Sequence, residues 1–157
     1  VAIGSGLNLP HYPLGVEITG IDLSPEMLRL AQKRAQKLGL SVKLVTGDVE
    51  DLPFTPQSFD TVVSTLSLCT FPNPGWAVRQ MRLVCKPDGQ LLFLEHGKSN
   101  VQWCARLQNW WAPYHFKQLC CNMVREPLKM IREAGCRIIS QWRSQLGTVH
   151  VIVAAPF

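Results

Sequence analysis

The sequence of 157 residues lacks an uninterrupted apolar run of the roughly 18 residues that a membrane-spanning helix needs. Its longest apolar run, residues 149–157, is interrupted by His150 and is typical of a buried strand. Charged residues are also scarce, at 17% against 46% hydrophobic residues, which indicates a large interior such as a sheet covered on both faces. Disordered, collagen-like and coiled-coil classes are thereby excluded. The length favours a single domain over residues 1–157.

The six cysteines lack the spacing of metal-binding or disulfide motifs. No CxxC pair occurs and no histidine follows at zinc-finger spacing, so we expect reduced, mostly buried thiols and no metal site. Such thiols are typical of a reducing compartment, which favours a cytoplasmic protein. An anchor upstream of the first residue would add association with a membrane.

A concentrated basic surface is absent as well, although the net charge is +5. A nucleic-acid-binding protein gathers its positive charge in a patch or stripe, whereas the basic residues of this chain are dispersed. The best candidate patch lies on one predicted helix, at a spacing that an ordinary solvated helix face also shows: Arg29, Lys33, Arg34 and Lys37. We therefore expect no nucleic-acid partner.

Strand and helix patterns alternate along most of the chain. Strands are predicted at residues 16–22, 42–46, 59–66 and 91–96. Helices are predicted at residues 25–38, with Ser24 as N-cap, and at residues 73–84, and a turn at residues 86–89. This order implies a Rossmann-like α/β fold, with a doubly wound, mostly parallel sheet in three α/β/α layers.

The two ends of the chain depart from that alternation. Residues 137–142 and 148–155 are predicted strands joined by a short link, so they should pair as an antiparallel hairpin. The chain opens at Val1 with an apolar run that ends in Gly4-Ser5-Gly6. We expect the sequence to begin within the first strand, without the helix that would precede it.

Residues that follow the strands are the candidates for ligand binding, since open α/β sheets bind ligands beyond the carboxyl ends of their strands. Gly4-Ser5-Gly6 follows the first strand and would let a ligand approach backbone amides. Asp22 stands 18 residues after Gly4, where an acid can accept hydrogen bonds from both ribose hydroxyls. Asp48 follows the next strand and suits an adenine amine, or else a turn. Together these residues predict an adenosine-containing cofactor.

Two adenosine-binding motifs are missing. A dinucleotide fingerprint requires a third glycine where this chain has Leu9, which disfavours a NAD(P)-dependent oxidoreductase but leaves it as an alternative. No G-x-x-x-x-G-K-[ST] sequence occurs, so a P-loop is excluded.

Five motifs stand in order along the chain: Ala2-x-Gly4-Ser5-Gly6, Ile21-Asp22-Leu23-Ser24-Pro25-Glu26-Met27-Leu28, Gly47-Asp48-Val49-Glu50-Asp51-Leu52-Pro53-Phe54, Ser58-Phe59-Asp60 and Lys86-Pro87-Asp88-Gly89. In them the chain resembles the class I S-adenosylmethionine-dependent methyltransferases, specifically the type 11 methyltransferase domain related to quinone-biosynthesis methyltransferases. Cys69, Glu95-His96 and the tryptophan-rich segment are similar to methyltransferase-like proteins that include small-molecule thiol methylases. The chain departs from the family at Ala2, where the family has a glycine, and lacks the acid that precedes this motif in the family.

The resemblance implies S-adenosylmethionine as the cofactor. The backbone around Gly4, Ser5 and Gly6 would approach its methionine part, and Asp22 would hold its ribose hydroxyls. The adenine would lie within a second set of residues. In that set Leu23 and Met27 would pack against the ring, Asp48 would accept from its amine, and Val49 would offer its backbone amide.

The reacting end of the cofactor would be lined by Thr65 and Leu66. Methyl transfer from a sulfonium is an in-line displacement that depends mainly on positioning and on exclusion of water. A base is needed where the acceptor must lose a proton, and His96, at the carboxyl end of a predicted strand, is the best candidate; a loop-capping role is its alternative. Cys69 would approach the same pocket or form a buried structural thiol, and Glu95 should point to the opposite face.

The acceptor is expected to be a small, rather apolar molecule with an oxygen, sulfur or carbon nucleophile. An Asn-Pro-Pro-Tyr type motif, which would suggest methylation of an amide or nucleobase nitrogen, is absent. Trp103, Leu107, Trp110 and Tyr114 form one helical stripe, typical of a helix packed on its own domain. A lid over an apolar substrate and contact with a membrane surface are the alternatives. The non-enzyme alternative is a truncated methyltransferase fold that acts as a binding protein.

Overall fold

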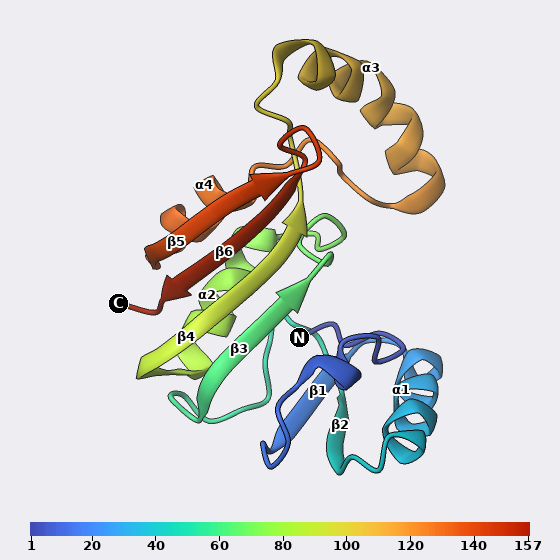
Figure 1. The fold of residues 1–157 in the computed structure, drawn as a ribbon, viewed down its shortest axis with the longest axis vertical. Coiled ribbons are helices and arrows are strands. Elements are labelled where there is room, and N and C mark those ends of the chain that lie inside the picture. Colours follow the sequence, from blue (N-terminus) through green and yellow to red (C-terminus); the bar gives the residue numbers. More distant parts are fainter. The chain divides into compact units, whose positions relative to one another are not determined.

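The computed structural model describes residues 1–157, which form two compact units, Val1–Pro53 and Phe54–Phe157. We call them unit 1 and unit 2 and describe each by itself (Figure 1). The expectation of one domain over residues 1–157 stays a prediction.

Unit 1 pairs two parallel strands and one helix. Its elements are the short 3₁₀ helix Leu9–His11, β1 (Ile18–Asp22), α1 (Pro25–Lys37) and β2 (Val42–Thr46). The register pairs Asp22 with Thr46, so both strands end at the same edge. Ahead of β1, the Ile3 amide donates to the Ile21 carbonyl oxygen at 3.0 Å. The first residues therefore run beside β1.

Helix α1 begins where its sequence predicts. The Ser24 hydroxyl oxygen accepts from the Met27 amide at 3.2 Å, which satisfies one of the free amides of the first turn. Leu28, Ala31 and Ala35 are buried, whereas Met27 and Leu38 are exposed. The buried face of α1 is therefore formed by small and aliphatic residues three or four positions apart.

Unit 2 holds a four-stranded mixed sheet in the order β3-β4-β6-β5. Its elements are β3 (Phe59–Thr65), α2 (Pro74–Val84), β4 (Cys85–His96), α3 (Gln102–Leu119), α4 (Pro127–Glu133), β5 (Arg137–Ser144) and β6 (Val149–Ala155). Strands β3 and β4 are parallel, while β6 pairs antiparallel with β4 and with β5. The predicted α/β class and its C-terminal hairpin are confirmed.

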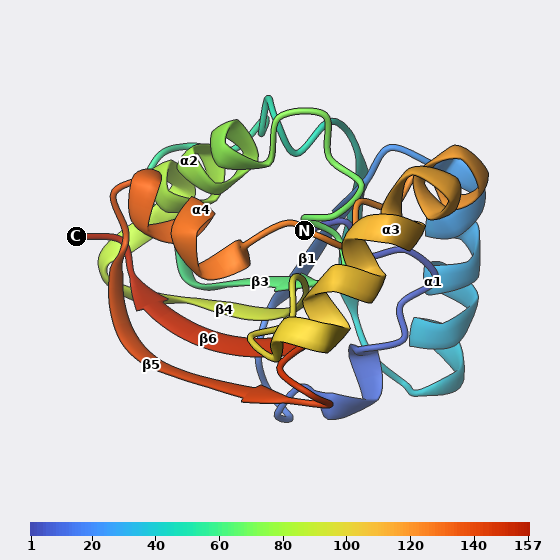
Figure 2. The ribbon, with the colours of Figure 1, turned by 90° about the horizontal axis from the view of Figure 1, so that it is seen from above.

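Helices α2 and α4 cover the same face of this sheet, as Figure 2 shows. The buried side of α2 consists of four apolar residues on one face of the helix: Ala77, Val78, Met81 and Val84. They contribute to a core completed by Leu91 and Phe93 of β4 and Ile152 of β6. The apolar stretches of the sequence thus fill the space between sheet and helices.

The predicted turn at residues 86–89 is instead an irregularity inside β4. Phe59 pairs with Cys85, but the next paired residue on β3, Thr61, faces Gln90. Four residues of β4 therefore lie between two successive paired positions. Gly89 permits this close approach, because a Cβ there would stand 2.6 Å from the Asp60 carbonyl oxygen.

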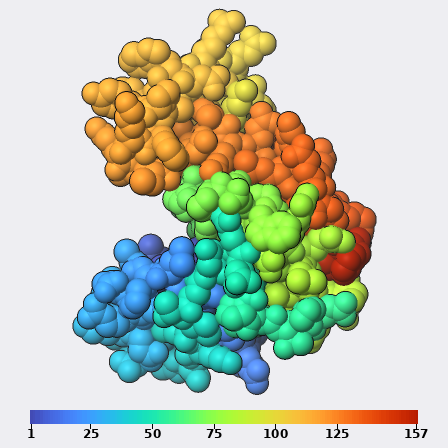
Figure 3. Space-filling view, turned by 180° about the vertical axis from the view of Figure 1, so that it is seen from behind, coloured from blue at the N-terminus to red at the C-terminus, as the bar shows by residue number.

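Helix α3 turns its aromatic side chains outward. The predicted packing stripe is exposed throughout, from 55% at Leu107 to 73% at Trp110, and no residue of the helix is buried. The expectation that this stripe packs on its own domain is wrong. Figure 1 shows α3 projecting beyond the strand ends of unit 2, and in the space-filling view of Figure 3 the yellow to orange residues of this part of the chain protrude.

The opposite side of α3 faces unit 2 and is largely polar or small. Its half-buried residues include Cys104, Ala105, Gln108, Ala112 and His115. The Gln108 side chain accepts from the Ser99 amide at 2.8 Å and donates to the Gly97 carbonyl oxygen at 3.0 Å. Hydrogen bonds rather than apolar packing therefore hold this helix. None of the helices is both long and apolar enough to cross a bilayer.

His150 of β6 is a buried histidine whose protonation should affect stability. It is 2% exposed, and its Nε2 has no hydrogen-bond partner. Burial is the main cause that lowers the pKa of His150. The charges of Arg143 and His96 lower this pKa further, whereas the Lys98 backbone and Glu126 raise it. Because the folded pKa lies below the unfolded value of 6.5, the unfolded chain binds more protons as the pH falls through that value. The His150 contribution to stability is thus present at neutral pH and lost on acidification.

We predict that His150→Gln loses less stability than the unmodified protein between about pH 7.5 and about pH 5.5. Urea unfolding midpoints at the two pH values measure the difference. The exposed His11, changed to Gln, serves as the control and should keep the original dependence. An unaltered pH dependence in His150→Gln would contradict the prediction.

Candidate functional site

In unit 1 the carboxylate of Asp22 joins the glycine turn to the start of α1. Its Oδ2 accepts from the Gly4 amide at 2.8 Å, and its Oδ1 accepts from the Ser24 amide at 3.0 Å. Gly4 has a φ of +56°, a left-handed conformation that glycine adopts without strain. The predicted residues Gly4 and Asp22 are therefore in direct contact.

The rest of the turn is fixed by close packing and by one arginine. A Cβ at Gly6 would lie 2.8 Å from Leu9 Cδ1 and 3.2 Å from Ala31 Cα, so only glycine fits. Arg34 donates to the Ser5 carbonyl oxygen at 2.7 Å, so this member of the suspected basic patch has a structural role. Ala2 has a φ of +46°, which costs a residue with a Cβ about 1 kcal/mol.

The other predicted cofactor residues of unit 1 surround the same strand ends. Asp48 is exposed and its Oδ1 accepts from the Glu50 amide at 2.8 Å, so the turn role foreseen for it is present. The neighbouring Val49 side chain is buried. Leu23 and Met27 follow Asp22 with exposed apolar side chains. Exposure of such side chains beside a polar turn is what a bound planar ring would require.

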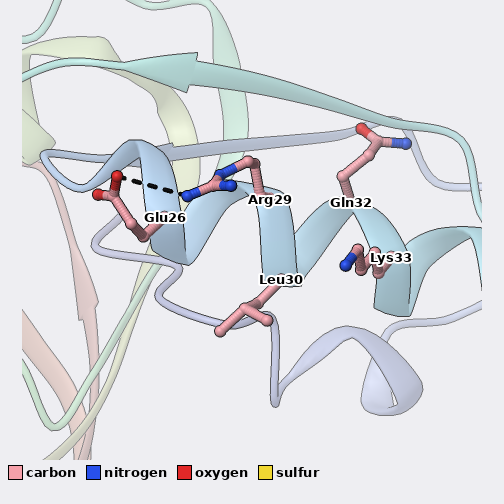
Figure 4. Close-up of a pocket in the computed structure, with 5 residues that line it drawn as sticks. All are labelled: Glu26, Arg29, Leu30, Gln32 and Lys33. Atoms are coloured by element: carbon pink, nitrogen blue, oxygen red, sulfur yellow. Dashed lines mark hydrogen bonds and ion pairs between the residues drawn. The ribbon is translucent and has the colours of Figure 1, made fainter.

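A surface pocket of unit 1 lies along α1 (Figure 4). Its lining comes from α1 alone: Glu26, Arg29, Leu30, Gln32 and Lys33. The Arg29 guanidinium stands 3.5 Å from the Glu26 carboxylate, one turn away on the same helix. None of the predicted cofactor residues lines it, so we assign no function to this pocket.

In unit 2 the buried Glu95 organises the loop that follows β3. Its carboxylate accepts from the Ser64 hydroxyl at 2.7 Å and from the amides of Ser67 and Leu68 at 3.0 and 3.2 Å. Burial raises the pKa of Glu95 to about 7, against the lowering effect of these hydrogen bonds. The predicted Thr65 ends β3 and the predicted Leu66 begins the loop, where it is exposed with a left-handed φ of +51°.

His96, the predicted base, points to the other face of β4 because successive strand residues alternate. It is half-buried, and burial lowers its pKa, with a smaller effect of His115. Its Nε2 lies 3.2 Å from the Sγ of Cys121. The expected opposition of Glu95 and His96 across the strand agrees with the hydrogen bonds of Glu95.

Cys121 was not singled out in the sequence, yet it joins two residues that were. The Sγ atoms of Cys69 and Cys121 and a ring nitrogen of His96 all lie within 4.8 Å of one another. Burial raises the pKa of the Cys69 thiol to about 12, with Cys121 and Glu95 adding to the effect. All six cysteines are free thiols, of which Cys69, Cys85 and Cys136 are buried. Spacing along the chain could not reveal the cluster, because three separate segments supply it.

Known proteins resemble the chain in sequence and in structure. Residues 1–93 match the model of a methyltransferase domain family. A phosphatidylethanolamine N-methyltransferase of Cereibacter sphaeroides is 37% identical over 98 residues, which cover 61% of this chain and 48% of that protein. A ubiquinone/menaquinone biosynthesis C-methyltransferase of Bartonella tribocorum is 32% identical over 96 residues, 60% of this chain and 37% of that protein.

The chain therefore spans about half or less of the length of these curated relatives. In structure it is similar to geranyl diphosphate methyltransferase in complex with SAM, with a TM-score of 0.82 and 15% identity over 100% of this chain and 76% of the other. This likeness shows the fold. The candidate residues His96 and Cys121 lie beyond the region matched by the family model.

Two substitutions of Glu95 should show that its hydrogen bonds, more than its charge, stabilise the loop. We predict that Glu95→Ala lowers the free energy of unfolding by about 3 kcal/mol or more, because the buried amides of Ser67 and Leu68 lose their acceptor. Glu95→Gln should cost about 1 kcal/mol, since its amide oxygen can accept from both amides and its nitrogen can donate to Ser64. Urea unfolding of both variants measures these costs. Equal losses in the two variants would contradict the assigned role.

Proposed function

Because the chain belongs to the methyltransferase domain family, we propose that it moves a methyl group from S-adenosylmethionine to a small, apolar acceptor by in-line displacement. The observation that carries the proposal is the contact of Asp22 with the glycine turn of unit 1. A carboxylate oxygen has two lone pairs, and each oxygen of Asp22 uses one of them on a backbone amide. A second acceptor position on each oxygen is left for the two ribose hydroxyls.

The adenine of the cofactor would lie beyond Asp22 along the same edge. Leu23 and Met27 present exposed apolar side chains to a ring there, and Asp48 keeps lone pairs for the exocyclic amine. The backbone amide of Val49 would donate to the ring. The methionine part would approach the amides of the turn, whose Gly4 carries no Cβ.

A nicotinamide dinucleotide fits unit 1 less well. The third glycine of its fingerprint would stand at Leu9, which is 1% exposed and packs its Cδ1 against Gly6. In the fingerprint this third glycine allows the helix to pack closely on the strand, which a leucine side chain at the same position prevents. The packing of Leu9 thus favours S-adenosylmethionine over NAD(P).

For the chemical step we assign two roles. Thr65 and Leu66 line the methyl end of the cofactor, and His96 is the base that accepts a proton from the acceptor. The transfer breaks the bond from the methyl carbon to the sulfonium sulfur as the acceptor atom forms its new bond. An oxygen, sulfur or carbon acceptor then yields one proton, which the unprotonated nitrogen of the neutral His96 ring accepts. S-adenosylhomocysteine leaves as the neutral thioether.

The exposed aromatic face of α3 supports an apolar acceptor. Trp103, Trp110 and Tyr114 present large apolar surface that this chain does not bury. The names of two relatives contain phosphatidylethanolamine and ubiquinone/menaquinone, both lipids with long apolar chains. We assign this face to the binding of the small, apolar acceptor, and peripheral contact with a membrane surface is the alternative use of the same residues.

The first test is binding of the cofactor product. S-adenosylhomocysteine at about 100 times its Kd should stabilise the folded protein by about 2.7 kcal/mol, and NAD(P) should not stabilise it. Thermal unfolding with each compound measures the effect. Stabilisation by NAD(P) alone would favour the oxidoreductase, and stabilisation by neither would favour a fold without cofactor.

Asp22→Asn tests the residue that carries this proposal. An asparagine nitrogen cannot accept from the Gly4 or Ser24 amide or from a ribose hydroxyl, so the affinity for S-adenosylhomocysteine should fall about tenfold or more. Calorimetry measures it, with Glu17→Gln as a control that removes an exposed charge before the start of β1. Unchanged affinity in Asp22→Asn would mean that the ribose is held by other residues.

His96→Gln tests the proton acceptor. We predict a turnover number lowered by about 10² or more, with affinity for S-adenosylhomocysteine unchanged, because the ring would act only on the acceptor. Labelled S-adenosylmethionine and a panel of phenols, thiols and quinols give the rates. His11→Gln is the matched control. An undiminished turnover number would remove His96 from the chemical step.

A further inference from the structure

We propose that Cys69, His96 and Cys121 of unit 2 form a binding site for one thiophilic divalent cation, with Zn²⁺ as the ion of best fit. Two thiols and one imidazole are the ligands that zinc prefers in proteins. Their donor atoms all lie within 4.8 Å of one another, and the Cys121 Sγ and His96 Nε2 are 3.2 Å apart. The site is a property of this cluster and does not depend on methyl transfer.

The separations lie within about 1 Å of those in a tetrahedral zinc site. Zinc lies about 2.3 Å from sulfur and about 2.0 Å from nitrogen, which sets its ligands roughly 3.3–3.8 Å apart. The pair Cys121–His96 is already near that spacing. Since no separation exceeds 4.8 Å, the other pairs have to close by at most about 1 Å, which a side-chain rotation of the half-buried Cys121 can supply.

The three ligands come from segments that backbone contacts hold together. Cys69 lies in the loop after β3, His96 ends β4, and Cys121 follows α3. The amide next to Cys121, that of Asn122, donates to the Cys69 carbonyl oxygen at 3.0 Å. Arg125 donates to the carbonyl oxygens of Leu68 and Phe71, the latter at 2.8 Å. These contacts bring the cysteines together without any contribution from the thiols themselves.

The end of α3 selects which of two adjacent cysteines enters the cluster. Cys120 adopts a left-handed φ of +51° and its amide donates to the Phe116 carbonyl oxygen, which caps the helix. Cys120 is exposed as a result, and Cys121 turns toward His96. His115 reinforces the turn, with its Nδ1 3.1 Å from the Cys121 carbonyl oxygen.

Three protein ligands leave the fourth position of a tetrahedral ion open. Structural zinc sites are closed by four protein ligands, whereas an open position takes water or the donor atom of a bound molecule. Cys69 is buried while His96 and Cys121 are half-buried, so the open side is the one nearer solvent. An ion on Nε2 and proton acceptance by Nε2 use the same lone pair, so the two exclude each other in one molecule.

The test is metal binding by the reduced full chain, measured without cofactor. Co²⁺ should give the thiolate charge-transfer absorption of a cysteine-ligated ion, Zn²⁺ should displace it, and the stoichiometry should be one ion per chain. Cys121→Ser and His96→Gln should each lower the affinity by about 100-fold or more, since even residues outside the ligand set change it 10–100-fold. Cys120→Ser, which alters the adjacent exposed thiol, is the matched control and should bind as before.

The proposal is overturned if no thiolate absorption appears, or if Cys120→Ser loses as much metal affinity as Cys121→Ser. It is also overturned if one equivalent of Zn²⁺ does not protect Cys69 and Cys121 from oxidation to a disulfide. Circular dichroism of each variant verifies that the fold is kept. Cys121→Ser is the main test of the cysteine ligands, because replacing the buried Cys69 by serine can prevent folding. Binding of S-adenosylhomocysteine after chelation is measured in parallel. If the metal-free protein does not bind S-adenosylhomocysteine but the metal titration succeeds, the proposed function is contradicted and the metal site stands.

Discussion

The buried carboxylate of Glu95 is the interaction on which the chemistry-bearing end of unit 2 depends. A carboxylate removed from water is costly unless donors surround it, and here the donors come from the loop after β3. Holding that loop against β4 fixes the left-handed Leu66 and the thiol of Cys69 on one side. Arg125 then binds the same loop through its carbonyl oxygens and fixes the segment that carries Cys121.

Unit 1 solves a related problem with Asp22. Backbone amides at a glycine turn and at a helix start need an acceptor, and one carboxylate at the end of β1 serves both. The same residue is the one that a ribose would engage. Structure and binding thus draw on a single group, and its loss would affect the local backbone as well as the ligand. In each unit an acidic residue near a strand end shapes the loop beside it.

Much of this fold could be predicted, because its signals are local. The β-branched and apolar run of Val42–Thr46 gave a strand with the bounds predicted, and Ser24 with Pro25 marked the start of α1. Where the prediction failed, tertiary contacts decided. Residues 86–89 carry turn residues, yet pairing with β3 on either side keeps them within a strand. The stripe of α3 has the period of a packed face, but periodicity cannot tell which partner an apolar face meets. The contact between Cys121 and His96 could not be predicted either, because it forms only where the chain turns back after α3.

The polar attachment of α3 has a thermal consequence. Gln108 and His115 hold the helix through hydrogen bonds, and its large apolar side chains are already in water. Detaching α3 would therefore expose little additional apolar surface and change the heat capacity only slightly. Unfolding of the sheet beneath it exposes Leu91, Phe93 and Ile152 and carries a large heat-capacity change. The attachment of α3 should weaken almost linearly with temperature, whereas the stability of the sheet follows a curve with a maximum.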